Sequence, residues 1–163
     1  MIVLGIDPGT IAMGYGVIKS SRHEIALVAC GALTAPRSAT ISERLHQLYS
    51  GLQKIIARYQ PEVIAIEQPF VAKNVKSALA IGKAQAIAML AAASQSIPVH
   101  EYSPTHIKRR VSNYGGSSKE QIQEMVKIQL GLPQVPQPSD AADALAVALC
   151  HLSEDHLNKL LTK

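Results

Sequence analysis

The chain has little of what several protein classes need. Only 4% of its 163 residues are aromatic, with no Trp and a single Phe, Phe70. This composition argues against a protein that binds single strands by stacking bases on many aromatic side chains. Its two cysteines, Cys30 and Cys150, are too few for a disulfide framework and favour a reduced, intracellular protein. We therefore expect both to be small core residues.

Signals that would direct the chain out of the cytoplasm or into a membrane are also missing. The N-terminal sequence MIVLGIDPGT has no basic region and reaches an acidic residue at Asp7, which is atypical of a signal peptide. The most apolar long stretch, Ala78 to Ala93, is interrupted by Lys83 and Gln85, so we expect no ordinary membrane span. These observations predict a cytoplasmic protein that has no membrane partner.

What is present indicates one ordinary folded domain. The length is near the usual size of a single domain, and we find no internal repeat or linker, so we expect one domain over residues 1–163. Hydrophobic residues reach 47% and charged residues only 17%, which argues against disorder. The 16 basic residues exceed the 12 acidic ones and give a net charge of +4, a mild excess that favours a polyanionic partner.

Turn and capping signals predict a mixed α/β domain. Three apolar runs near the N-terminus are separated by gaps too short for parallel crossovers, which favours an antiparallel meander. Helical periodicity and capping boxes then alternate with two further strands. We therefore expect an α/β fold with a mixed five-stranded sheet and helices on both faces. The predicted strands are 2–6, 14–18, 24–34, 63–67 and 98–102, and the predicted helices are 41–59, 74–95, 119–130 and one from about 139.

Four acidic residues occupy informative positions. Asp7 and Glu67 each follow an uninterrupted apolar run, at the rim where α/β proteins usually build their sites. Asp140 and Asp143 are three residues apart and share one face of the first turn of the last helix. Each also has a plainer interpretation when it is taken alone. Asp7 could be a turn residue, Glu67 a solvated strand end, and the helical pair simply complementary to the helix dipole.

Taken together, the four carboxylates suit divalent metal ions. If they converge on one spot, they repel one another and force one or more of them to keep a proton. Mg²⁺ removes that cost, because it takes oxygen ligands from a few carboxylates and keeps waters for a phosphate substrate. Two such ions can activate a water and stabilise the leaving oxygen in phosphodiester cleavage. The residues thus indicate metal-dependent phosphate chemistry.

Four motifs, in order along essentially the whole chain, carry a family resemblance. They are GIDPGT at 5–10, GYGVI at 14–18, IEQPF at 66–70 and DAADALA at 140–146. With the chain length, they resemble the motifs of RuvC-type crossover junction endodeoxyribonucleases. The resemblance implies an RNase H-like fold, a homodimer and a magnesium-dependent nuclease that resolves four-way (Holliday) DNA junctions by paired nicks in recombination and repair. It assigns the catalytic and metal-binding roles to Asp7, Glu67, Asp140 and Asp143.

The resemblance also suggests a mechanism and partners. We hypothesise that the four acids hold two Mg²⁺ ions per active site, with Mn²⁺ able to substitute. A metal-activated water would then attack the scissile phosphorus in line and leave a 5′-phosphate and a 3′-hydroxyl. The implied partners, besides four-way junction DNA and a second copy of the chain, are a branch-migration complex of the RuvA and RuvB type.

Basic residues supply candidate DNA contacts. Lys76 and Lys83 are seven residues apart on the long predicted helix and share one face, although a solvated position is the ordinary state of a single lysine. In the family that the chain resembles, lysines matching Lys108 and Lys119 flank the active site. The segment 112–118 departs from the loop that the family usually has there, so we transfer no loop contacts beyond Lys119.

Phe70 is a candidate wedge. A lone Phe is most often a core residue, but this one follows Gln68 and Pro69 in a predicted loop after one of the acids. By the same resemblance, it wedges against an unstacked base at the crossover, which is a known way of gripping distorted DNA. We expect no metal-ligand role for the histidines, because their spacing fits no ligand pattern.

Three other functions stay open from the residues alone. An actin-like or sugar-kinase-like phosphotransferase opens with a similar Asp-x-Gly-Thr turn, but it needs a second domain for which 163 residues leave no room. A binding-only domain that has lost its metals is disfavoured by the four intact acids. A related nuclease that cuts an RNA hybrid or a linear duplex is not distinguished by physical reasoning alone.

Overall fold

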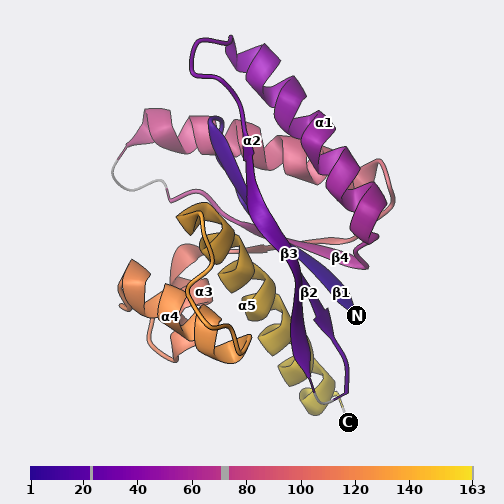
Figure 1. Ribbon diagram of the computed structural model, residues 1–163, viewed down its shortest axis with the longest axis vertical. Helices are drawn as coiled ribbons and strands as arrows, with labels where there is room; N and C mark the ends of the chain where they lie inside the picture. The colour runs from indigo at the N-terminus through magenta and orange to yellow at the C-terminus, as the bar shows by residue number, and fades with distance from the viewer. Residues whose placement is uncertain (23, 71–73, 163) are drawn as a thin grey trace.

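A five-stranded sheet forms the centre of the computed structural model, which describes residues 1–22, 24–70 and 74–162 (Figure 1). The strand order is β3-β2-β1-β4-β5. β2 pairs antiparallel with both β1 and β3, whereas β4 pairs parallel with both β1 and β5. The predicted meander and mixed sheet are therefore confirmed. The strands are β1 (Ile2–Asp7), β2 (Ala12–Ser20), β3 (Ile25–Thr34), β4 (Val63–Glu67) and β5 (Val99–Tyr102).

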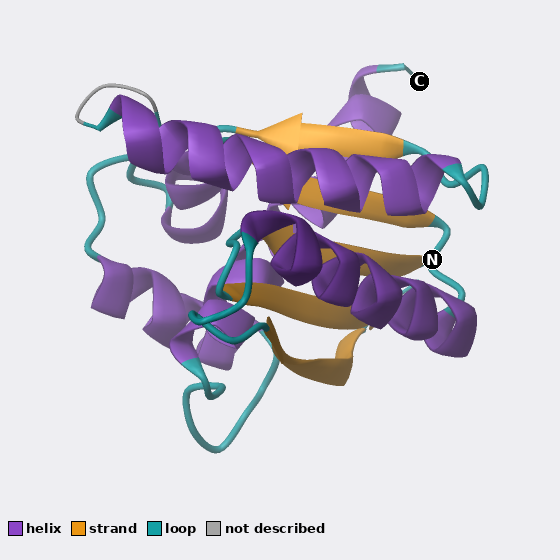
Figure 2. Ribbon diagram, turned by 90° about the horizontal axis from the view of Figure 1, so that it is seen from above, coloured by secondary structure: helices purple, strands orange, loops and turns teal. Residues whose placement is uncertain are grey.

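Helices cover both faces of the sheet, as expected for an α/β domain (Figure 2). α1 and α2 pack on one face, and α3, α4 and α5 pack on the other. The predicted capping box forms at Thr40, before α1. The box before α4 forms one residue later than the predicted Ser117–Glu120 pair, between Ser118 and Gln121. The helices are α1 (Ile41–Tyr59), α2 (Val75–Ala93), α3 (Pro104–Ser112), α4 (Lys119–Gln129) and α5 (Ser139–Leu161).

One helix, α3, was not predicted from the sequence. Its signals are local: Ser103 caps it by accepting a hydrogen bond from the backbone N–H of His106, and proline stands at its first position. It buries only Ile107 and Val111, which are four residues apart. Two apolar positions are too few to reveal a helical period in the sequence. The segment is helical because these two residues are buried against α4 and α5.

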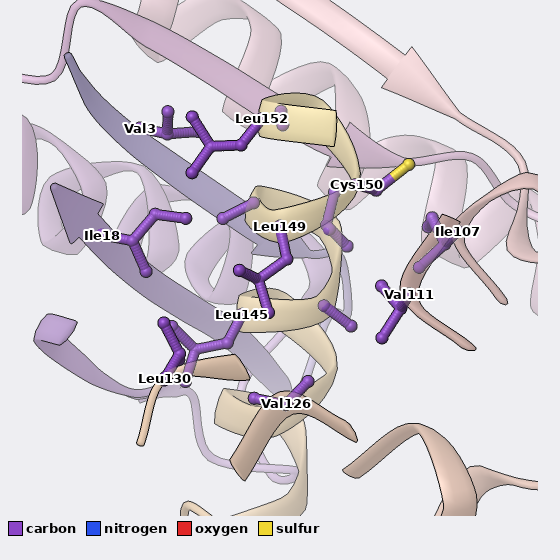
Figure 3. Packing of buried hydrophobic residues seen from close by; sticks show 14 of the residues in the cluster. Val3, Ile18, Ile107, Val111, Val126, Leu130, Leu145, Leu149, Cys150 and Leu152 are labelled. Carbon is purple, nitrogen blue, oxygen red and sulfur yellow. The ribbon is translucent and has the colours of Figure 1, made fainter. Parts of the chain in front are cut away.

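Strand alternation decides which side chains face which helices. In β1, Leu4 and Ile6 belong to the core under α1 and α2, whereas Val3 belongs to the core under α5. Asp7 continues the series of Val3 and Gly5, because side chains alternate with a period of two. Figure 3 shows the α5 core, in which Val3 and Ile18 of the sheet lie near leucines of α5. The alternation therefore directs the last side chain of β1 toward the α5 face.

Two sheet glycines let α5 lie against the sheet at backbone distance. A Cβ on Gly5 would lie 2.1 Å from the carbonyl oxygen of Ala144, and a Cβ on Gly14 would lie 2.0 Å from that of Asp140. No side chain larger than hydrogen fits at either position. The glycines of the first two motifs therefore fix the height and position of the α5 N-terminal half over β1 and β2.

α2 corrects one expectation from the sequence. By length and composition alone it could cross a membrane, despite Lys83 and Gln85, so these two residues do not exclude a span. Its packing is one-sided: four alanines lie buried in the core under α1 and α2, whereas only 28% of the apolar window is buried. The four alanines are Ala84, Ala88, Ala91 and Ala92.

Candidate active site

The ends of two central strands bring the first pair of predicted acids together. β1 and β4 are parallel neighbours, with Ile6 opposite Ile66, so the next residue of each strand, Asp7 and Glu67, leaves the sheet at the same edge. Glu67 follows Val63 and Ala65 of the α5 core in the strand alternation, just as Asp7 follows Val3. Both carboxylates therefore lie on the α5 face and line one pocket of about 310 Å³.

The first turns of α5 bring the other two acids to the same edge. Gly14 is opposite Asp7 in the β1–β2 register, and a Cβ on it would lie 3.1 Å from the Cβ of Asp140. Asp143, one turn further, lines the pocket with Asp7 and Glu67. Asp140 is outside the pocket lining but close enough to raise the pKa of Asp7. The predicted convergence of the four acids is therefore present in the fold.

The electrostatics of the pocket show an excess of negative charge. Burial, followed by the charges of Glu67, Asp143 and Asp140, raises the pKa of Asp7 to about 8. Burial and then Asp143 raise the pKa of Glu67 to about 7. The positive charge of Lys119 acts in the opposite direction on both groups. The protein itself therefore supplies too little positive charge to keep both carboxyl groups ionised at neutral pH.

Lys119 is the direct basic partner in the pocket. Its Nζ lies 2.7 Å from Oδ2 of Asp143, and this hydrogen bond is the main reason that the pKa of Lys119 is raised. Lys108 of α3 also lines the pocket and lowers the pKa of Glu67. Both lysines that the resemblance assigned to the flank of the site are thus located there.

The four carboxylates have the right chemistry for a hard divalent cation, but their side chains are not arranged as a complete metal-binding group. Among the described residues, no three His, Cys, Asp or Glu side chains are arranged as a metal-binding group, and Asp143 is held by Lys119. Carboxylate oxygens are nevertheless the ligands that Mg²⁺ prefers. The raised pKa of Asp7 is the electrostatic mark of a site that favours added positive charge.

The remaining predicted contacts lie outside the pocket. Phe70 follows β4 with its side chain 63% exposed, so it is not a core residue. Lys76 and Lys83 are exposed on α2, on the opposite face of the sheet from α5. These three side chains do not line the pocket, and they are accessible to a ligand much larger than it.

Two of the histidines, His106 and His151, form hydrogen bonds with neighbouring side chains. His151 is buried, and its Nδ1 lies 2.8 Å from the hydroxyl oxygen of Tyr102. His106 Nε2 lies 2.6 Å from Oε1 of Glu154, which also pairs with Arg110. Of the cysteines, Cys150 is buried as expected, whereas Cys30 is only partly buried beside the same core.

Two features near the site were missed at the sequence level. The first is the pair of close contacts of α5 at Gly5 and Gly14, whose signal was the glycine in each of the first two motifs. The second is Arg44 of α1, whose Nη1 lies 3.4 Å from Oγ1 of Thr10 in the turn after β1. No local pattern marks Arg44, because the contact joins positions 34 residues apart in the chain.

Comparison with known proteins gives consistent similarities over the whole chain. Residues 3–151 match the family model described as crossover junction endodeoxyribonuclease RuvC. The chain is 55% identical to a protein of that name from Dehalococcoides mccartyi, over 100% of this chain and 98% of the relative. It is 53% identical to one from Chloroflexus aggregans, over 93% of this chain and 92% of the relative.

Solved structures show the same similarity in three dimensions. The structure of Thermus thermophilus RuvC in complex with a Holliday junction substrate superposes with a TM-score of 0.90 at 30% identity, covering 97% of this chain and 96% of that one. A second Thermus thermophilus RuvC structure superposes with a TM-score of 0.88 at 30% identity, covering 97% of both chains. The strand order and the helices on both faces are therefore those of an already known nuclease fold, the RNase H-like fold.

Proposed function

The chain belongs to the RuvC family of crossover junction endodeoxyribonucleases, a family of DNA nucleases, and we propose that it resolves four-way DNA junctions by magnesium-dependent cleavage. The observation that carries this proposal is the convergence of four carboxylates at one edge of the sheet, two from strand ends and two from the start of α5. The Thermus thermophilus relative was solved with a Holliday junction substrate, which supports junction DNA as the substrate. The four proposed catalytic residues are Asp7, Glu67, Asp140 and Asp143.

These carboxylates would hold Mg²⁺, because the described residues that line the pocket offer no other metal-ligand side chain. Mn²⁺ has the same octahedral oxygen chemistry. When bound, two such ions supply activation of a water and neutralise charge on the leaving oxygen. Asp7 and Glu67 are the best placed to be ligands, because burial and mutual repulsion make their ionised forms costly without a cation. The expected products are a 5′-phosphate and a 3′-hydroxyl.

Lys119 acquires a defined role in this scheme. In the free protein its ammonium group neutralises Asp143 at 2.7 Å. If Asp143 helps to hold a metal ion, its carboxylate would no longer need Lys119, and the ammonium group could contact a phosphate oxygen of the bound strand. Lys108, on the same pocket wall, adds a second positive charge toward the substrate. Both lysines then stabilise the negative charge that increases at the scissile phosphate.

Residues outside the pocket would hold the rest of the four-way junction in place. Phe70 is exposed next to β4 and is proposed to insert beside an unstacked base at the crossover. Lys76 and Lys83 are proposed to contact the phosphate backbone from α2, which contributes affinity but no sequence readout. All three are exposed, as a contact with a large, flat substrate requires.

Paired nicks in a symmetric junction require two active sites, and α2 offers the surface for a homodimer. Val75, Leu79 and Leu90 are 64%, 65% and 56% exposed along one side of this helix. Gly82 lies among them, and a Cβ on it would meet nothing within 4 Å, which leaves room for a close helix contact. We propose that a second copy covers this side of α2, with Lys76 and Lys83 at the border of the contact and still open to DNA. We also propose that the dimer acts in the cytoplasm with a branch-migration complex of the RuvA and RuvB type.

The proposal is tested by cleavage of labelled four-way junction, linear duplex and RNA–DNA hybrid, each with Mg²⁺ and with EDTA. We expect cleavage of the junction alone, and only with the metal. The Asp7→Asn variant should bind the junction as the unaltered protein does and cut it at least about 1,000-fold more slowly, because a proposed metal ligand and its charge are lost.

Three results, two from this experiment and one from a separate assay of ATP hydrolysis, would contradict the proposal. Unimpaired cutting by Asp7→Asn would remove Asp7 from the catalytic residues. Equal cutting of duplex or hybrid would assign another nucleic acid as the substrate. Hydrolysis of ATP in the absence of DNA would instead favour a phosphotransferase of the actin-like class. Asp155→Asn is the matched control, because Asp155 pairs with Lys159 on α5 and does not line the pocket.

A further inference from the structure

Arg44 is a cationic side chain at the active-site edge to which the proposed function gives no role. It lies near the start of α1. β3 runs in the same direction as β1, because both are antiparallel to β2. The segment after β3, which leads into α1, is therefore at the edge where Asp7 leaves the sheet. The backbone N–H of Ala35 donates to the carbonyl oxygen of Ile11 at 2.8 Å, which ties this segment to the turn after Asp7.

The guanidinium group of Arg44 is incompletely satisfied. Nη1 reaches Oγ1 of Thr10 at 3.4 Å, which is long for a hydrogen bond. Nε is buried and has no hydrogen-bond partner in the part of the chain that the structure describes. No ion pair among the described residues includes Arg44, whereas Arg110 and Lys119 both have a carboxylate partner. An unpaired buried donor is unfavourable, so this side chain gains from an acceptor that the protein does not provide.

Thr10 places a hydroxyl group beside this cation at a defined position. It is the third residue after Asp7, in a turn where a Cβ on Gly9 would lie 2.1 Å from the carbonyl oxygen of Ala12. The backbone of the turn is thus too tightly closed to carry a side chain at position 9. The tight turn therefore fixes the position of the Thr10 hydroxyl relative to Asp7, the proposed metal ligand three residues earlier.

We propose that Arg44 and Thr10 form a phosphate subsite that binds the DNA backbone next to the scissile phosphate. The inference rests on the proposed function, since it assigns a contact for the same substrate. A guanidinium group presents parallel N–H donors that match two phosphate oxygens, and a threonine hydroxyl donates a third hydrogen bond. A backbone phosphate thus supplies acceptors for the outer nitrogens of the guanidinium group, whose one side-chain hydrogen bond among the described residues is the long contact of Nη1 with Thr10.

The position of the subsite complements the basic residues of the pocket. Arg44 comes from α1, on one face of the sheet, whereas Lys108 and Lys119 come from α3 and α4, on the other face (Figure 2). A strand that crosses the edge of the sheet over Asp7 is then held from both faces. Contacts on both sides of the scissile phosphate restrict its position more than contacts on one side, which favours the reactive geometry.

The test uses four-way junctions that each carry one uncharged methylphosphonate near the cleavage site. Binding is measured by fluorescence anisotropy with EDTA for the unaltered protein, Arg44→Gln and the matched control Arg58→Gln. Arg58 lies at the far end of α1, stacked over the ring of Tyr59 at 5.3 Å. We expect Arg44→Gln to bind about tenfold more weakly and its salt dependence to be shallower by about 0.9 in log–log slope. Arg58→Gln should change neither.

The position-specific result decides the proposal. One methylphosphonate should weaken binding of the unaltered protein about tenfold and should not weaken Arg44→Gln further, because both changes remove the same contact. The subsite would be overturned if, at every methylphosphonate position, the losses of binding caused by the methylphosphonate and by Arg44→Gln simply multiplied. It would also be overturned if Arg44→Gln bound the junction as the unaltered protein does. If Arg44→Gln does not fold, Thr10→Val is judged by the same criterion. Failure of the unaltered protein to cut the junction with Mg²⁺ would instead overturn the proposed function.

Discussion

The Asp7 side chain lowers the stability of the folded protein at neutral pH. Its pKa is raised from 3.8 to about 8, mainly by burial and then by three neighbouring carboxylates. A raised pKa means that the folded state holds a proton that the unfolded chain has already released. The resulting contribution to stability is fully favourable below pH 3.8 and is lost as the pH rises toward 8. Glu67 contributes with the same sign up to about pH 7.

Replacement of Asp7 by Asn should therefore stabilise the metal-free protein. One pKa unit corresponds to about 1.4 kcal/mol, so the cost at pH 7 is on the order of a few kcal/mol. We expect the melting temperature of Asp7→Asn in EDTA to rise by at least about 3 °C at pH 7.5 and by less at pH 5. Asp155→Asn, scanned in parallel, should give no such pH-dependent rise. A lower melting temperature for Asp7→Asn at both pH values would contradict this account.

Phe70 should be important for the substrate and unimportant for the fold. Its side chain is 63% exposed, so we expect Phe70→Ala to change the free energy of unfolding by no more than about 0.5 kcal/mol. Cleavage of four-way junctions should fall about tenfold, whereas Phe70→Tyr should keep most of it, because stacking needs only an aromatic face. Leu161→Ala, an exposed apolar residue on α5, is the control. Junction cleavage by Phe70→Ala at the unaltered rate would disprove the wedge.

At the scale of elements, the contact between α5 and the sheet sets the geometry of the acids. α5 carries Asp140 and Asp143, while β1 carries Asp7. α5 meets β1 at Gly5 and the neighbouring strand β2 at Gly14, in both places without an intervening side chain. The helix has no side-chain cap at its N-terminus, so this contact and the core below it fix its first turn. Small displacements of α5 thus change the separation of the acids directly.

Gly14→Ala tests this dependence. Its Cβ would lie 2.0 Å from the carbonyl oxygen of Asp140, and backbone atoms must move to relieve that overlap. We expect junction cleavage to fall at least about 100-fold, since misplacement of about 1 Å is enough, and the protein to lose about 1–3 kcal/mol of stability. Gly51→Ala in α1, where the three nearest atoms belong to the side chain of Leu33 and not to the backbone, is the control. Wild-type cleavage by Gly14→Ala would show that the acids tolerate movement of α5.

The elements that were predicted correctly are those with strong local signals. α1 and α4 have capping boxes, and the first three strands are separated by short turns that permit only antiparallel pairing. α3 was missed because its apolar pattern consists of Ile107 and Val111 alone. That omission concerned function as well as fold, since α3 brings Lys108 to the pocket wall.

At the scale of the whole molecule, the exposed side of α2 predicts self-association. Leu79 is 65% exposed in the middle of this apolar surface. Leu79→Glu should leave the monomer folded, raise the dimer dissociation constant at least about tenfold and abolish paired nicking of the junction. Leu160→Glu, at a 54% exposed position near the end of α5, controls for the added charge. Light scattering together with junction cleavage gives the measurement, and a Leu79→Glu dimer of unaltered strength would exclude α2 as the interface.

Charge also acts at this scale. Twelve acidic residues oppose 16 basic ones, and the four proposed catalytic acids are the ones that bound cations would neutralise. The surface that meets DNA is then more positive than the net charge of the chain indicates, and association with junction DNA should weaken steeply with salt.

The sequence by itself determined the strand ends that carry Asp7 and Glu67, the helix turn that carries Asp140 and Asp143, and the family, because motif order and local periodicity are properties of the chain. Only the tertiary structure decided that Gly14 admits α5 to backbone distance, that Lys119 neutralises Asp143 and that Arg44 approaches Thr10. Each of these contacts joins residues far apart in the chain, and their distances depend on how two elements pack. Packing is decided by the complete set of side chains in the core, which no single segment of sequence contains.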